Sequence, residues 1–204
     1  MVYHVFNKSI ADFVIFNNPA EYLRMLMAVR YYQGCERTVS LSTFLKSKAP
    51  EWKIDRILIR IIAYCLMPTH IHLIVSEEDS GDVSKFTGDV LNSYSRYFNI
   101  KHKRKGPLWE ARSTYIPIKS EEQLLHTTRY VHLNPVTAYI VNKPENWPYS
   151  SYNEYISNIE EDKRICSYSP ELEINPIIYR RFVEEQISYQ RELASIYRNS
   201  DRVG

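Results

Sequence analysis

The chain has few cysteines, few glycines and no long apolar run. Its three cysteines, Cys35, Cys65 and Cys166, are odd in number and widely spaced, which excludes a disulfide framework and the spacing of a zinc site. Glycine accounts for only 5 of 204 residues, and the sequence contains no internal repeat and no low-complexity segment. No apolar stretch approaches the roughly 18 residues of a membrane span, and no signal peptide opens the sequence. We therefore expect no membrane span and a reducing, cytoplasmic location.

The chain does have ample apolar content, many tyrosines and an uneven distribution of charge. Hydrophobic residues make up 44% of the sequence and tyrosine 17 of its 204 residues, a length typical of one medium domain or one domain with an appendage. The net charge is only +2. Residues 94–119, however, carry a single acid, Glu110, against seven bases: Arg96, Lys101, Lys103, Arg104, Lys105, Arg112 and Lys119. Such a local excess indicates a surface that faces a polyanion.

Hydrophobic periodicity predicts strands and helices in the order β-α-β-β-α-β-α. The expected strands are residues 3–6, 57–66, 70–76 and 108–118, and the expected helices begin at about residues 20, 83 and 120. Ser120 is a good N-cap for the last of these helices, with Gln123 at the capping-box position. This order predicts an α+β fold, an antiparallel sheet of the ferredoxin-like kind with helices on one face.

Two segments depart from this alternating pattern. Residues 34–56 are polar and contain Gly34 and Pro50, so we interpret them as a variable insertion with a short helix near residues 41–48. After residue 141 a strap rich in proline and aromatic residues precedes a helix expected at 176–197. We predict a domain over residues 1–141 and a C-terminal strap and helical tail over 142–204.

Two histidines separated by one residue are the most informative feature. His70 and His72 follow the turn Met67-Pro68-Thr69 and begin a predicted strand. Alternate residues of a strand point to the same face, so the two imidazoles lie side by side. This spacing suits two ligands of one metal ion, and it also suits two histidines on a half-solvated sheet surface.

The second candidate feature is Tyr130 with Asn134 on the last predicted core helix. Four residues apart, the two side chains share one face of that helix. A tyrosine hydroxyl can act as a nucleophile, but its pKa near 10 makes it weak at neutral pH unless a metal activates the electrophile. The alternative is structural: tyrosines commonly pack and make one hydrogen bond, and Asn134-Pro135 suits the start of a new helical turn.

Together these segments resemble a known family. Met67-Pro68-Thr69-His70-Ile71-His72-Leu73-Ile74 resembles the histidine–apolar–histidine (HUH) motif of single-tyrosine transposases. The segments 106–112, 129–136 and 147–152 resemble, in the same order, motifs of their REP-associated, IS200-like branch. The resemblance spans about residues 3–156. Thr69 departs from it, because many relatives have asparagine there, and so do the insertion at 34–56 and the tail.

The resemblance implies the palm fold of HUH endonucleases and a metal-dependent cleavage of single-stranded DNA. Tyr130 would be the nucleophile that forms a 5′-phosphotyrosine link and leaves a free 3′-OH. His70, His72 and Asn134 would hold a divalent metal, Mg²⁺ or Mn²⁺. The partner would be single-stranded DNA carrying a hairpin, and the protein would act as a monomer or homodimer, in a mobile or domesticated copy.

The basic stretch fits DNA binding, although a solvated turn would look the same. We predict phosphate contacts from Lys101, Lys103, Arg104, Lys105 and Arg112, and stacking faces from Tyr94, Tyr97 and Trp109. Three alternatives to a transposase remain at this point. One is a replication- or relaxation-type HUH nickase, although these are usually larger. A non-catalytic nucleic-acid-binding module would bind DNA without covalent capture, and a structural zinc protein would lack ligands.

Overall fold

A four-stranded antiparallel sheet, in the order β2-β3-β1-β4, forms the centre of the molecule. The computed structural model describes residues 1–34, 39–47, 56–78, 82–160 and 163–200. The strands are β1 (Val2–Lys8), β2 (Ile59–Met67), β3 (His70–Glu77) and β4 (Thr114–Ile118). The predicted α+β class and the predicted order of core elements are therefore confirmed.

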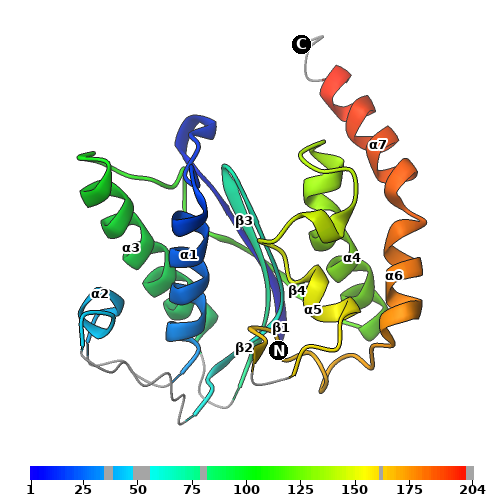
Figure 1. The fold of residues 1–204 in the computed structure, drawn as a ribbon, viewed down its shortest axis with the longest axis horizontal. Coiled ribbons are helices and arrows are strands. Elements are labelled where there is room, and N and C mark those ends of the chain that lie inside the picture. The colour runs from blue at the N-terminus through cyan, green and yellow to red at the C-terminus, as the bar shows by residue number, and fades with distance from the viewer. Residues whose placement is uncertain (35–38, 48–55, 79–81, 161–162, 201–204) are drawn as a thin grey trace.

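Helices cover both faces of this sheet (Figure 1). The helices α1 (Pro19–Tyr32) and α3 (Val83–Lys101) lie on one face, as predicted. The predicted placement of the helices on one face was wrong for α4 (Glu121–Thr137), which lies on the other face with α5 (Tyr152–Ile156) beside it. The reason is that β2 and β3 are buried along almost their whole length, and strands apolar on both faces require cover on both.

The remaining elements are short or lie at the periphery. The helix α2 (Leu41–Phe44) falls inside the predicted insertion, and two 3₁₀ turns are η1 (Ile10–Asp12) and η2 (Pro144–Asn146). The helices α6 (Pro176–Glu184) and α7 (Ile187–Ser200) pack outside α4. Within the described residues, no helix has both the length and the apolar character that crossing a membrane requires.

Two predicted elements were wrong in extent. Of the strand expected at 108–118, residues 114–118 form β4 and Trp109 forms an isolated antiparallel bridge with Ser9. Between them the Asn7 side chain, rather than a regular backbone ladder, binds this segment at Ala111 O. The single helix expected at 176–197 is two helices, and the break after residue 184 allows α6 and α7 each to contact α4.

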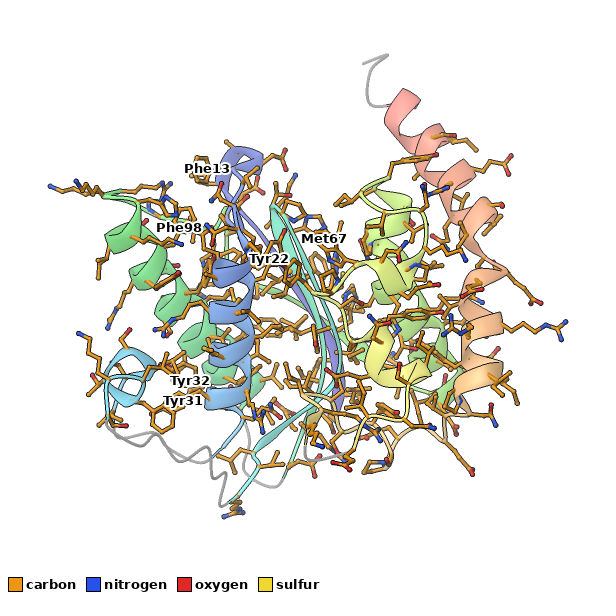
Figure 2. The ribbon with its side chains drawn as sticks, viewed as in Figure 1. Phe13, Tyr22, Tyr31, Tyr32, Met67 and Phe98 are labelled. Atoms are coloured by element: carbon orange, nitrogen blue, oxygen red, sulfur yellow. The ribbon has the colours of Figure 1, made fainter. Side chains whose placement is uncertain are left out.

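The core between the sheet and α1 and α3 is rich in aromatic side chains (Figure 2). Phe98 on α3 is 1% exposed and meets Phe13 edge-on, with ring centroids 6.0 Å apart. Tyr22 on α1 is also buried, and its ring stacks on Tyr149 of the strap at 3.7 Å. Burial of such rings contributes a large part of the hydrophobic stabilisation of a domain.

The strap after α4 runs along the free edge of β2. The Leu66 N–H donates to Tyr149 O at 2.9 Å, and the Ser151 N–H donates to Tyr64 O at 2.9 Å. The Trp147 indole N–H donates to Leu66 O at 2.9 Å. These bonds satisfy backbone groups that an edge strand leaves unpaired. The domain boundary expected after residue 141 stays a prediction.

Candidate active site

Tyr130 and the histidine pair, far apart in sequence, meet on the α4 side of the sheet. The ring of Tyr130 is edge-on to that of His72, with centroids 5.7 Å apart. The rings of His70 and His72 lie 5.2 Å apart. Tyr130 is 45% exposed, whereas His72 is 6% exposed. The fold thus places a phenol that solvent can reach beside two imidazoles.

The tight hairpin between β2 and β3 positions both histidines. In the register of the two strands, His70 stands opposite Met67 and His72 stands opposite Cys65. Because alternate residues share a face, both rings leave the same side of β3, as the spacing predicted. The turn residue Thr69 adds a contact, since its Oγ1 lies 3.0 Å from His70 Nδ1. This hydrogen bond fixes the orientation of the His70 ring.

A third histidine, His4, belongs to the same group and was missed at the sequence level. Its Nε2 and the Nδ1 of His72 share a hydrogen bond of 3.0 Å, and its ring centroid is 6.0 Å from that of Tyr130. The strand at residues 3–6 was predicted, but its register was not. Pairing of Phe6 with His72 is what brings His4 to the site, and single-sequence patterns do not reveal such pairing.

The helix α4 presents Tyr130 and Asn134 on one face. Ser120 caps its first turn by accepting from the Gln123 N–H at 3.1 Å, as predicted. Pro135 lies inside the helix, so the interpretation of Asn134-Pro135 as the start of a new turn is wrong. The Asn134 side chain donates from Nδ2 to the Tyr130 carbonyl at 3.0 Å. Pro135 has no N–H to donate to the Val131 carbonyl, and the Asn134 bond lies one residue before this gap in the helix.

Burial keeps all three histidines of the site neutral. It lowers the pKa of His4 to about 4 and lowers the pKa of His70, which the nearby charge of Lys8 lowers further. The pKa of His72 is well below its usual value because of burial and of the neighbouring His70 and His4. Neutral imidazole is the form that binds metals.

The Tyr130 phenol is less acidic than a free tyrosine. Burial raises the pKa of its hydroxyl, and a side-chain hydrogen bond with Asn134 opposes that rise. The group is therefore protonated at neutral pH, and as a nucleophile it requires help to lose its proton.

The donor atoms of the site fit a divalent metal. Bonds from Thr69 and His4 occupy the Nδ1 atoms of His70 and His72, which leaves each Nε2 without a hydrogen-bond partner among the described residues. Such outer bonds commonly fix the rings of metal ligands. Asn134 donates through Nδ2 and keeps its amide oxygen available. Among the described residues, no group of three or more His, Cys, Asp or Glu could hold a metal, and the candidate set here consists of two histidines and an amide oxygen.

A cation, Lys8, borders the histidine pair and was also missed at the sequence level. Lys8 stands opposite His70 in the pairing of β1 with β3. Its Nζ lies 2.8 Å from the Asp12 carboxylate, and both side chains are more than half exposed. An exposed ion pair of this kind is weak, so Lys8 remains free to approach a phosphate group.

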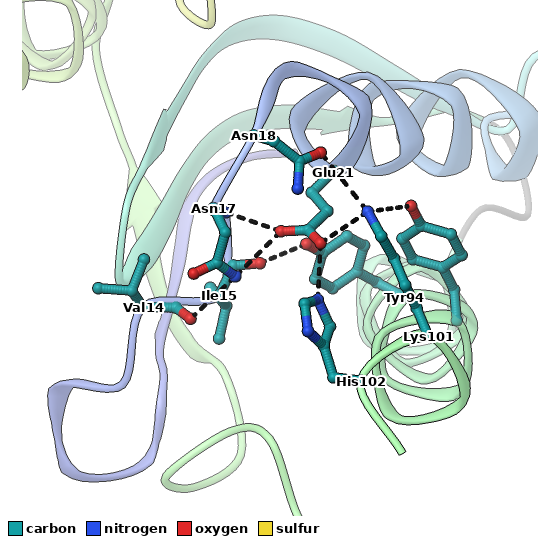
Figure 3. Close-up of polar contacts among 9 residues, drawn as sticks. Val14, Ile15, Asn17, Asn18, Glu21, Tyr94, Lys101 and His102 are labelled. Carbon is teal, nitrogen blue, oxygen red and sulfur yellow. Dashed lines mark hydrogen bonds and ion pairs between the residues drawn. The ribbon is translucent and has the colours of Figure 1, made fainter. Parts of the chain in front are cut away.

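The predicted basic turn is a separate region, at the end of α3 on the other face of the sheet (Figure 1). Lys101 and its neighbour His102 bind Glu21 of α1, at 2.8 and 2.7 Å (Figure 3). Burial alone would raise the pKa of the Glu21 carboxyl, but bonds from Lys101, the Asn17 backbone and His102 lower it to about 2. Lys101 thus joins α3 to α1.

The other predicted DNA contacts differ in their surroundings. Arg104 folds back on its own turn, donating to Pro107 O at 2.8 Å and to Asn99 Oδ1 at 3.1 Å. Lys103 and Lys105 are exposed. Arg112 is also exposed and lies beside β4, away from the basic turn. Their contacts with DNA stay predictions.

Comparison with known proteins agrees with this geometry. The sequence model of the family described as "Transposase IS200 like" matches residues 30–134 of the chain. A Haemophilus influenzae protein named as a REP-associated tyrosine transposase is 26% identical over 102 residues, which are 45% of this chain and 58% of that protein. The chain thus matches little more than half the length of this curated relative.

One solved structure extends the likeness to the fold. The structure of a REP-associated tyrosine transposase bound to a REP hairpin matches with a TM-score of 0.55 and 16% identity, over 85% of this chain and 92% of that one. A transposase structure from Deinococcus radiodurans matches more weakly, with a TM-score of 0.38 and 10% identity over 64% and 88% of the two chains. The resemblance deduced from the histidine and tyrosine motifs is confirmed, and the chain belongs to the IS200-like transposase family.

Proposed function

We propose that this protein cleaves single-stranded DNA and transfers the cut strand through a covalent bond to Tyr130. The observation that carries the proposal is the position of Tyr130, half exposed and 5.7 Å from the ring of His72. Its ring also lies 6.0 Å from that of His4, so a phenol open to solvent adjoins two imidazoles at once.

In the proposed reaction the Tyr130 oxygen attacks the phosphorus atom of a phosphodiester. The O–P bond to tyrosine forms while the bond to the 3′ oxygen breaks, which yields a 5′-phosphotyrosine and a free 3′-OH. The phenol gives up its proton to solvent, and the departing 3′ oxygen takes one up. Attack by a second 3′-OH on the phosphotyrosine reverses the step and joins strands. Because the phosphodiester energy is conserved, no nucleotide cofactor is required.

The residues around Tyr130 divide the remaining tasks. His70, His72 and the Asn134 amide oxygen would hold Mg²⁺ or Mn²⁺. When bound, such a metal makes the phosphate more electrophilic and neutralises the charge that develops on it. His4 orients the His72 ring, Thr69 orients the His70 ring, and Lys8 offers a positive charge to the incoming phosphate.

We further propose that the substrate carries a hairpin and that the reaction takes place in the cytoplasm. The hairpin is suggested by the solved relative, which is bound to a REP hairpin. A non-catalytic DNA-binding module is the competing function. It would bind the same DNA but would form no covalent product.

Covalent capture of labelled DNA tests the proposal. Wild-type protein incubated with Mn²⁺ and a single-stranded, hairpin-bearing oligonucleotide should give a product that a denaturing gel does not dissociate. Tyr130→Phe removes one oxygen and keeps the ring, so it should bind the DNA nearly normally and form no adduct. Tyr139→Phe is the matched control, because Tyr139 is 55% exposed and lies just beyond α4. An adduct that persists in Tyr130→Phe, or that mass spectrometry maps to another tyrosine, would refute the assignment.

A further inference from the structure

A groove lies between α3 and the segment that leads into β4. It has a volume of about 340 Å³, at the small end of the range for ligand pockets. Its walls include Asn7, Gly88, Asn92, Trp109, Arg112 and Tyr115. Phe6 faces His72, and neighbouring residues of a strand point to opposite faces, so Asn7 faces the side of the sheet away from Tyr130.

The walls of this groove are held in place before any ligand arrives. The Asn7 side chain donates to Ala111 O at 3.2 Å and to Ser113 Oγ at 3.1 Å, which ties the irregular segment to β1. The Trp109 indole N–H donates to Ser95 Oγ of α3 at 2.9 Å. A preformed site of this kind loses little conformational entropy when it binds.

The chemistry of the lining suits a flat, polar ring system. Trp109 and Tyr115 supply aromatic surface, and the Asn92 amide can both donate and accept. Arg112 adds an exposed positive charge. At Gly88, a Cβ atom would meet nothing within 4 Å, so the helix surface is hollow at this point. Unpaired nucleobases are recognised by this combination of stacking surface, amide edge and arginine.

The groove is within reach of the candidate active site. His72 pairs across the sheet with Phe6, and Phe6 pairs with Thr114. Two steps between strands amount to roughly 10 Å along the sheet, and the DNA strand must in addition pass round the edge of β4, because Tyr130 and the groove lie on opposite faces. Thr114 is exposed, and among the described residues nothing pairs with β4 on its outer side. A strand whose phosphate lies at Tyr130 can therefore pass over β4 into the groove.

We propose that this groove binds one unpaired nucleobase of the single-stranded DNA substrate, a few nucleotides from the phosphate that Tyr130 attacks. The base stacks in the space left by Gly88, its edge meets Asn92, and Arg112 contacts the backbone beside it. This inference rests on the proposed function, and it adds a site that fixes the position of the cut along the strand.

An abasic scan combined with a filled groove tests the proposal. The probe is a single-stranded, hairpin-bearing oligonucleotide in which one unpaired nucleotide at a time lacks its base, and the readout is the dissociation constant by fluorescence anisotropy. One flanking position should show a loss of affinity of roughly 5- to 150-fold in wild-type protein. In Gly88→Leu, whose side chain fills the groove, the intact DNA should bind as weakly as the abasic DNA. The loss of affinity on removing the base, called the abasic penalty below, should therefore vanish.

Two controls make the result decisive. Gly88→Ala leaves most of the groove empty and should keep the penalty. Leucine favours a helix over glycine, so α3 should stay folded, and circular dichroism checks this. Should Gly88→Leu nevertheless unfold, Asn92→Ala should reduce the same penalty.

A scan in which no position shows a loss of affinity, or a penalty unchanged in Gly88→Leu, would overturn the groove assignment. Because the readout is binding, a protein that shows the penalty but never forms an adduct would refute only the proposed cleavage.

Discussion

Two buried histidines differ in role: His72 is a candidate metal ligand, whereas His132 is a structural residue. Both are shielded from solvent, and burial lowers the pKa of each. His132 on α4 has both ring nitrogens engaged, with Nδ1 2.7 Å from the Tyr179 hydroxyl and Nε2 2.8 Å from Ser151 Oγ. His72 has only Nδ1 engaged among the described residues, by His4. The nitrogen without a partner, rather than burial or a lowered pKa, distinguishes a candidate ligand from a structural residue.

The largest expected effect comes from removing the candidate ligands. Replacing His70 and His72 together with alanine should reduce metal-dependent cleavage by on the order of 10³-fold, because a metal contributes several kcal/mol of charge stabilisation in such reactions. The measurements are adduct formation across a Mn²⁺ titration and Mn²⁺ binding by calorimetry. Unchanged Mn²⁺ affinity in this variant, or full activity in excess chelator, would show that His72 is not a metal ligand and does not differ from His132 in this respect.

The second effect is on stability and concerns His132. Replacing His132 with leucine should lower the free energy of unfolding by about 2–4 kcal/mol, because it removes a partner from two buried hydroxyls. Urea denaturation measures this loss. His126→Leu is the matched control, since His126 is exposed on the same helix, and it should change stability by no more than about 0.5 kcal/mol. The affinity for Mn²⁺ should be unaffected in the folded fraction of either variant.

The pH dependence of unfolding sharpens the same test. The pKa of His132 falls from 6.5 in the unfolded chain to about 3 in the folded protein. The contribution of His132 to the free energy of unfolding is complete above pH 6.5 and is lost as the pH falls towards 3. The reason is that the unfolded chain binds a proton in this range and the folded state does not. Each proton changes the slope by about 1.4 kcal/mol per pH unit. Wild type should therefore lose stability more steeply than His132→Leu in this window, and equal slopes would contradict the assignment.

A smaller effect should separate the lysines of the basic turn. Replacing Lys103 and Lys105 with alanine should weaken single-stranded DNA binding a few-fold and reduce the salt slope by roughly 0.7 for each phosphate that is no longer neutralised. Lys101→Ala should instead lower stability, because it leaves the buried Glu21 carboxylate without one of its partners. Binding across a salt titration measures the first effect and urea denaturation measures the second. A salt slope identical to wild type in the double variant would show that the turn does not meet DNA.

Local patterns predicted the parts of the site that local geometry controls. His70 and His72 share a face because strand residues alternate, and Tyr130 and Asn134 share one because of the helical repeat. The capping of α4 by Ser120 is equally local. No local pattern placed the tyrosine over the histidines, and that expectation came from the family resemblance.

The features that sequence reasoning missed depend on contacts between distant segments. His4 reaches His72 through the register of β1 with β3, a separation of 68 residues. In the sequence Lys101 is simply one of a run of positive charges, but in the fold it pairs with Glu21 of another helix. The strand expected from residue 108 is interrupted where the Asn7 side chain, 104 residues earlier in the chain, binds Ala111 O. Each of these three features depends on packing between distant segments, which a single sequence does not reveal.

The strap along β2 also has a consequence for biosynthesis. Chains fold as they emerge from the ribosome, beginning at the N-terminus. The edge of β2 therefore stays bare until residues 149–151 have been made, although every strand and the nucleophile helix α4 are complete before that. An uncovered apolar edge is a template for pairing with other chains. The strap thus protects the chain against aggregation. A fragment that ends at α4 would contain every candidate catalytic residue but would leave the edge of β2 unpaired and prone to aggregation.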